Sequence, residues 1–167
     1  ARIYKYTSVN EIYSQISKGA DLEALKGGEE NRHGIVAVYS PSGGSGKTTI
    51  AAGLCRALNN AGKQVLFVGT DSLQTFGYYL EQPKVLEADI EKQILAESSY
   101  MYNEIRPHIL HQGFDILPLL PNVHPSSGIE SEHYTSLIRK IKDAGEYDHI
   151  VLDMATDFTK ITMSLLG

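Results

Sequence analysis

The residues with the clearest chemistry form one short run, which reads Gly43-Gly44-Ser45-Gly46-Lys47-Thr48-Thr49. Its glycines leave the backbone bare and permit positive φ, so that several N–H groups are able to face an anion. Lys47 is placed to reach the β- and γ-phosphates of a nucleotide, and the Thr48 hydroxyl is placed to ligate Mg²⁺. The run therefore predicts a phosphate-binding loop, in which Lys47 has a catalytic role as well as a binding role.

A strand and a helix are expected on either side of this loop. The apolar run Ile35-Val36-Ala37-Val38-Tyr39 precedes it and is typical of a buried strand. After the loop, apolar residues recur at helical spacing until Gly62 ends the pattern. The positive end of that helix, near Lys47, favours a bound anion. Because strand, loop and helix follow in the order that phosphate binding requires, a glycine-rich turn without a ligand is the weaker interpretation.

An acidic residue closes another apolar run near the end of the chain. The segment Tyr147-Asp148-His149-Ile150-Val151-Leu152-Asp153 resembles a Walker B strand, with Asp153 at its carboxyl end. Ligands collect at that end of the strands in open α/β sheets. We expect Asp153 to hold Mg²⁺ through a coordinated water, because Mg²⁺ keeps much of its hydration shell. Asp157 is better explained as a loop acid or a helix cap.

The Gly-Gly-x-Gly-Lys-Thr-Thr form of the loop resembles the deviant loop of the MinD/ParA ATPases, usually Lys-Gly-Gly-x-Gly-Lys-Thr-Thr. The resemblance implies that ATP contacts Ser42, Gly43, Gly44, Ser45, Gly46, Lys47, Thr48 and Thr49. In the family, the first lysine of this loop reaches across a dimer to the partner's nucleotide. Ser42 occupies that position here, and its short neutral side chain supplies no such charge. The serine in place of this lysine predicts that nucleotide binding is intact and that hydrolysis is slow.

The resemblance continues after the next expected strand, Val65-Leu66-Phe67-Val68. The family places an Asp-x-Asp there, and its second aspartate orients the attacking water near the metal. Asp71 matches this second acid, whereas Gly69 replaces the first. The resemblance thus implies a catalytic, metal-associated role for Asp71, beside Thr48 and Asp153. The other interpretation of Asp71 is a cap on the following turn.

The composition is that of an ordinary globular chain of 167 residues, with 42% hydrophobic residues and a net charge of −5. This acidic balance argues against nucleic acid as a partner of this segment, since nucleic-acid binding usually requires a basic face. Cys55 is the only cysteine, which excludes an internal disulfide and suits the cytoplasm. No apolar run approaches the ~20 residues of a membrane span. The histidines lack convincing metal-ligand spacing, so no transition metal is expected.

The remaining patterns alternate between helix and strand. Helices are expected over 86–98 and along the apolar stripe around 134–141, and a strand is expected over 114–119. Pro118 indicates either the end of this strand or a strand at the edge of the sheet. The alternation predicts an α/β fold with a mostly parallel sheet and helices on both faces, as in P-loop nucleoside triphosphatases of the MinD/ParA type.

Two parts are expected along the chain. Residues 1–33 resemble the end of a receiver-like domain followed by a glycine-containing linker at 26–31. Residues 34–167 form the second part, a partial P-loop ATPase domain. Domains of the MinD/ParA family continue past the Walker B strand with further strands, so their carboxy-terminal part is expected to be absent from this chain.

Within the MinD/ParA group, the chain most resembles the CpaE/TadZ proteins of Flp/Tad pilus assembly. The shared features are the missing lysine at position 42, the receiver-like segment in front, and Leu-Gln then Phe-Gly after Asp71. The resemblance implies a homodimer that forms with ATP and Mg²⁺, turns over weakly, and localises protein partners of a pilus or positioning machinery. Such a protein would lie in the cytoplasm, at a pole or at the inner membrane surface through its partners.

Two other functions stay open at this point. One is an active MinD/ParA-type partitioning or positioning ATPase, whose missing charge would come from elsewhere. The other is a bacterial tyrosine kinase, which shares these motifs and carries a tyrosine-rich tail. The ten tyrosines of this chain are spread along it and form no terminal cluster. A receiver domain in front, a basic surface or a tyrosine tail in the full-length sequence would separate the three functions.

Overall fold

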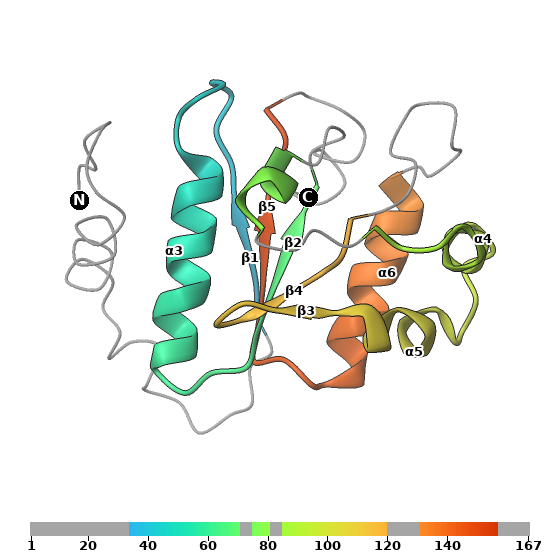
Figure 1. Cartoon of the computed structure of the whole chain (residues 1–167). Helices are drawn as coiled ribbons and strands as arrows, with labels where there is room; N and C mark the ends of the chain where they lie inside the picture. Colours follow the sequence, from blue (N-terminus) through green and yellow to red (C-terminus); the bar gives the residue numbers. More distant parts are fainter. Residues whose placement is uncertain (1–33, 71–74, 81–84, 120–130, 157–167) are drawn as a thin grey trace.

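Five strands form one sheet among the residues that the computed structural model describes, which are 34–70, 75–80, 85–119 and 131–156. The strands are β1 (Gly34–Val38), β2 (Val65–Gly69), β3 (Leu110–His111), β4 (Asp115–Ile116) and β5 (His149–Asp153). Their order across the sheet is β1-β5-β2-β4-β3 (Figure 1). β3 runs antiparallel to β4, and the other neighbours pair in parallel.

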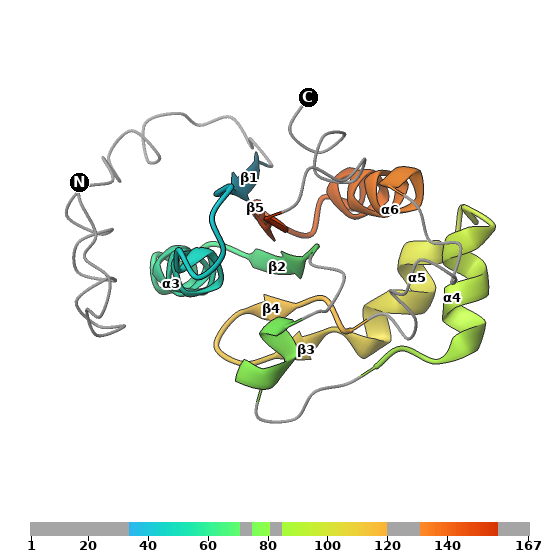
Figure 2. The same ribbon diagram turned by 90° about the horizontal axis from the view of Figure 1, so that it is seen from above.

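Helices cover both faces of this sheet, as Figure 2 shows. On one face lies α3 (Lys47–Asn60), which contacts β1, β2 and β5. On the other face lie α4 (Ala88–Leu95), α5 (Met101–Ile105) and α6 (Ser131–Ala144). Two short 3₁₀ helices complete the described elements, η1 (Thr75–Tyr79) and η2 (Arg106–His108). The alternation of helix and strand patterns predicted this α/β arrangement, and the structure confirms it.

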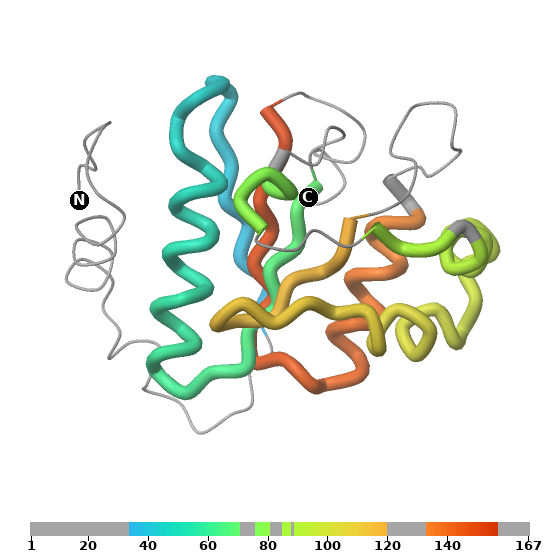
Figure 3. Tube along the Cα trace, viewed as in Figure 1, coloured from blue at the N-terminus to red at the C-terminus, as the bar shows by residue number. Residues whose placement is uncertain are grey.

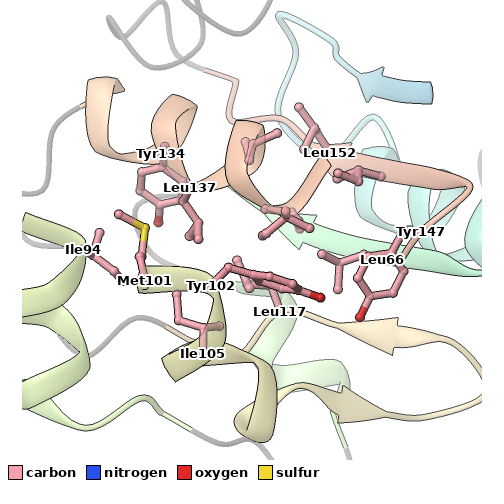
Figure 4. Close-up of a cluster of buried hydrophobic side chains, with 14 of the residues drawn as sticks. Leu66, Ile94, Met101, Tyr102, Ile105, Leu117, Tyr134, Leu137, Tyr147 and Leu152 are labelled. Atoms are coloured by element: carbon pink, nitrogen blue, oxygen red, sulfur yellow. The ribbon is translucent and has the colours of Figure 1, made fainter. Parts of the chain in front are cut away.

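Both faces of β2 are buried, because each face of the sheet has its own helical layer. Leu66 and Val68 belong to the hydrophobic cluster beneath α4, α5 and α6, whereas Val65 and Phe67 belong to the cluster beneath α3. Figure 4 shows side chains of the first cluster, including Leu66, Ile94, Met101, Tyr102, Ile105, Leu117, Tyr134, Leu137, Tyr147 and Leu152. A continuous apolar run such as 65–68 is therefore the expected sequence of a parallel strand covered on both sides.

The expected elements occur, with differences in their bounds. The helix expected over 86–98 is α4, and it ends earlier because Glu97 adopts a left-handed backbone with φ of +46°. The strand expected over 114–119 is confined to β4, after which Pro118 has no N–H to donate to a neighbouring strand. The apolar stripe of α6 is buried as expected. No sequence pattern predicted β3, whose two residues are too few to produce one.

Cys55 lies on the side of α3 that packs against the sheet, and its side chain is fully buried. Burial raises the pKa of the Cys55 thiol to about 12, and the charge of Asp153 adds to the rise more weakly. Because the thiolate is the reactive form, we expect Ellman's reagent at about pH 8 to leave the native chain unmodified and to label it in guanidinium. Rapid labelling of the native chain would contradict the described packing of α3.

Some expectations concern residues outside the described ranges. They are the receiver-like end and linker within 1–33, and the acids Asp71 and Asp157. The division of the chain between residues 33 and 34 therefore stays a prediction. Within the described ranges, each helix is too short or too polar to cross a membrane.

Candidate functional site

The carboxyl ends of β1, β5 and β2 meet at one edge of the sheet, beside the loop that leads into α3 (Figures 1 and 3). Asp153 is the last residue of β5, and in the strand register it lies between Val38 of β1 and Gly69 of β2. β5 is inserted between the two strands that α3 connects, so the chain order reverses here. Such a reversal is where open α/β sheets bind ligands. The fold thus brings the loop and Asp153 to one place.

The loop before α3 has the backbone that its glycines allow. Gly44 and Gly46 have φ of +67° and +84°, a conformation that side-chain-bearing residues rarely adopt. A Cβ atom added at Gly43, Gly44 or Gly46 would meet no heavy atom within 4 Å, so the space beside them is open. Gly46 is also the N-cap of α3, and no side chain caps this helix start. Open space and uncapped N–H groups together suit a bound anion.

Thr48, in the first turn of α3, donates a hydrogen bond from its hydroxyl to Oδ2 of Asp153 at 2.6 Å. Asp153 is only 5% exposed, and the first turn of α3 contains no acidic residue that would repel a phosphate group. Hydroxyl and carboxylate oxygens are the ligands that Mg²⁺ prefers, directly or through water. The two side chains therefore fit a magnesium ion, as the sequence predicted for Thr48 and Asp153.

Lys47 is the first residue of α3 and is half-buried at the end of the loop. At the exposed start of the loop, the N–H of Ser42 donates to Oγ of Ser40 at 3.2 Å, and the hydroxyl of Ser42 donates to the carbonyl of Gly43 at 3.4 Å. Both bonds stay within the loop, one through the backbone and one through the side chain of Ser42, and this neutral side chain brings no charge to the loop. The structure thus places residues 42–49 and Asp153 together, whereas Asp71 lies outside the described residues.

An aromatic ring occupies the space beside Gly69, which stands where the MinD/ParA resemblance implies an aspartate. A Cβ atom at Gly69 would lie 2.3 Å from Cε1 of Phe76 and 2.4 Å from Cδ1. Phe76 is 4% exposed, and its ring packs on Phe67 with the centroids 5.3 Å apart. The glycine is therefore a packing requirement, because the Phe76 ring takes the volume that an aspartate would need.

Replacing Gly69 by alanine is expected to lower the free energy of unfolding by about 1–3 kcal/mol, the usual cost of overpacking a core. Urea unfolding measures this cost. The same substitution combined with Phe76→Leu should cost less than the sum of the two single changes, because the overlapping ring atoms are gone. Gly43→Ala is the matched control, since a Cβ there meets nothing within 4 Å. Equal losses at positions 69 and 43 would contradict the packing account.

A cavity of about 370 Å³ runs along α3 beside the loop. Its lining is mainly aromatic and aliphatic, with Phe67, Phe76 and Phe114 among the side chains. Thr48 and Thr49 line it at the start of α3, but the loop glycines do not. The cavity therefore lies next to the glycine loop at residues 42–49 and not over it.

Two residues at this edge of the sheet carried no prediction of a role. Thr70 is buried directly after β2 and contacts the end of β5. The sequence signal that could have identified Thr70 is its position, a polar residue immediately after an apolar strand, and that strand is buried throughout in the structure. Phe76 gave no such signal, because its contact with Gly69 arises only in the folded chain.

Comparison with protein families matches residues 36–155 to the CobQ/CobB/MinD/ParA nucleotide binding domain. No curated protein sequence is similar enough to match this chain. Among solved structures, a ParA family ATPase from Chlorobium tepidum TLS is 23% identical with a TM-score of 0.63, covering 81% of this chain and 56% of that one. Cobyrinic acid a,c-diamide synthase from Mycobacterium smegmatis, with bound ADP and magnesium, is 19% identical with a TM-score of 0.59, covering 78% and 54%. The kinase domain of Escherichia coli tyrosine kinase ETK is 17% identical with a TM-score of 0.53, covering 91% and 60%.

These three structures support the fold, and this chain spans between 54% and 60% of their lengths. The family match is the more specific finding, because it extends from β1 to just after β5. It therefore includes both the loop and Asp153. The chain belongs to the CobQ/CobB/MinD/ParA family of nucleotide-binding domains.

Proposed function

We propose that this chain binds ATP together with Mg²⁺ at residues 42–49 and Asp153. The observation that carries the proposal is the 2.6 Å hydrogen bond between Thr48 and Asp153, next to a loop whose glycines face open space. It places a hydroxyl and a buried carboxylate at an uncapped helix start, where a phosphate group and its metal ion are stabilised together. The adenine base follows from the MinD/ParA resemblance, and one solved structural neighbour holds ADP and magnesium.

Each residue of the site has a distinct part in this proposal. The backbone N–H groups of the loop and the Lys47 ammonium would hold the phosphates. Thr48 and Asp153 would hold the magnesium ion, which neutralises charge on the β- and γ-phosphates when it is bound. Asp71 would orient the attacking water, as the family resemblance implies. Lys47 would also stabilise the charge that develops during hydrolysis.

The neutral side chain at position 42 supports a second part of the proposal, slow hydrolysis. Ser42 is exposed, and its hydrogen bonds to described residues go to Ser40 and Gly43 of the same loop. Its neutral side chain offers no cation to a second copy's nucleotide. The ATP-bound homodimer would then persist and act as a scaffold. We propose the role that the CpaE/TadZ resemblance implies, which is localising protein partners of a pilus or positioning machinery in the cytoplasm, at a pole or at the inner membrane surface.

Calorimetric titration of the chain with ATP tests nucleotide binding, in buffer with Mg²⁺ and in buffer with EDTA. We expect saturable binding to a single site that is at least about tenfold tighter with Mg²⁺, the scale on which partners of a metal site act. Titration with GTP in parallel tests the preference for adenine. Binding that is absent, or that is equally tight with Mg²⁺ and with EDTA, would contradict the proposal.

A further inference from the structure

We propose that Thr70 is a positioning residue for magnesium, which acts by holding the backbone of Asp153 in place. This inference rests on the proposed function, because it assigns a role toward the same metal ion. Thr70 is the first residue after β2 and is 3% exposed. Its hydroxyl extends the pairing of β2 with β5 beyond the last residue pair of the register, Gly69 with Asp153.

Four hydrogen bonds join Thr70 to the end of β5 and the two residues after it. The backbone N–H of Thr70 donates to the carbonyl of Asp153 at 3.0 Å. The hydroxyl of Thr70 donates to the same carbonyl at 3.1 Å and shares its proton with Sδ of Met154 at 3.9 Å. It accepts from the N–H of Ala155 at 3.3 Å. The side chain therefore bridges Asp153, which would hold the metal, and the residue two positions beyond it.

β1 fixes the other side of the same segment. The N–H of Met154 donates to the carbonyl of Val38 at 3.0 Å, so neighbours on both sides hold the backbone around Asp153. The carboxylate of Asp153 then accepts from Thr48 at 2.6 Å. A continuous set of hydrogen bonds thus runs from Ala155 through Thr70 and Asp153 to the loop helix. Thr70 has no contact with the loop in this set, so it acts on the site through the segment from Asp153 to Ala155.

The hydroxyl, and not the volume of the side chain, is the group that the inference requires. Valine has nearly the shape of threonine, but it would leave the buried N–H of Ala155 without its acceptor. Serine keeps the hydroxyl and loses only a methyl group. Thr70→Val and Thr70→Ser therefore separate the hydrogen bonds from the packing. Tyr102→Phe is a matched control, because it also removes a hydroxyl that donates a hydrogen bond, to Glu146 at 2.7 Å, on the face of the sheet away from α3.

The experiment measures the affinity of ATP for each variant with Mg²⁺ and with EDTA. We expect Thr70→Val to reduce the tightening of ATP binding by Mg²⁺ by about tenfold, the lower end of the range for partners that orient metal ligands. Its affinity in EDTA should match that of the wild type. Thr70→Ser and Tyr102→Phe should keep the full effect of Mg²⁺. Amide hydrogen exchange without nucleotide gives a second readout. The N–H groups of residues 154 and 155 should exchange faster in Thr70→Val than in the wild type, and at the wild-type rate in Thr70→Ser.

The outcomes separate the two claims. A wild-type chain that shows no effect of Mg²⁺ would contradict the proposed function itself. A normal wild type with an unchanged effect of Mg²⁺ in Thr70→Val would overturn the role of Thr70 and leave the proposed function standing. If Thr70→Val does not fold, Thr70→Cys takes its place, because a thiol is a weaker donor and acceptor than a hydroxyl. An unchanged effect of Mg²⁺ in Thr70→Cys would likewise overturn the inference.

Discussion

Replacing Ser42 by lysine is expected to raise the rate of ATP hydrolysis on the order of 10³-fold, the lower end of what a basic residue supplied in trans contributes. The reason is electrostatic. Charge builds on the γ-phosphate during its transfer, and a cation aimed at it stabilises the transition state more than the bound substrate. Ser42 is exposed at the start of the loop, so a longer side chain fits there without disturbing the core. Phosphate release at saturating ATP measures the effect.

A control substitution separates this effect from a general change in charge. Ser99→Lys adds the same charge at an exposed position between α4 and α5, and it should leave the rate unchanged. ATP affinity should also change little in Ser42→Lys, because the gain lies in the transition state. A wild type that already hydrolyses briskly, with no gain from the lysine, would contradict the slow-turnover part of the proposal. It would favour an active partitioning-type ATPase.

Replacing Lys47 by alanine is expected to weaken ATP binding on the order of 10²- to 10³-fold, since hydrogen bonds to charged groups each contribute about 1.5–3 kcal/mol. Lys47 opens α3 directly after the left-handed Gly46, where the helix start and the ammonium act on the same anion. Calorimetric titration of the variant with ATP and Mg²⁺ measures the loss. The site should lose affinity in EDTA as well, because Lys47 acts on phosphate and not on the metal.

Lys63→Ala is the matched control for this prediction. Lys63 lies beyond the other end of α3 and is paired with Asp148 at 4.0 Å, with its side chain 44% exposed. Removing it should leave ATP affinity unchanged. Urea unfolding of both variants should show stability close to that of the wild type, because neither lysine is in the hydrophobic core. Equal affinities of the Lys47 and Lys63 variants would show that the nucleotide binds elsewhere.

The site was predictable from sequence where its parts are local. Residues 43–49 contain the glycines, the lysine and the threonine in a fixed order, and the strand before them and the helix after them have clear periodicities. Asp153 is 105 positions from Thr48, yet its place at the end of an apolar run predicted the carboxyl edge of a parallel sheet. The contact between them therefore agrees with the expectation from the two motifs.

The parts that sequence did not predict depend on contacts between distant segments. Gly69 was visible as a departure from the Asp-x-Asp of the resemblance, but its contact with the Phe76 ring was not, because no periodicity marks a contact made across the intervening turn. Thr70 has partners more than 80 positions away, and no periodicity marks a single hydroxyl. The strand expected over 114–119 was longer than the observed β4, because the apolar residues continue beyond the part that pairs with β2.

The proposed scaffold role requires that ATP holds this chain in a long-lived dimer. Light scattering of the wild-type chain with ATP and Mg²⁺, combined with phosphate release from the same sample, tests it most directly. We expect a dimer with ATP and a monomer with ADP or without nucleotide. The dimer should persist for many minutes, because little phosphate is released. A mass that does not respond to ATP, or a dimer that disappears as phosphate is rapidly released, would contradict it.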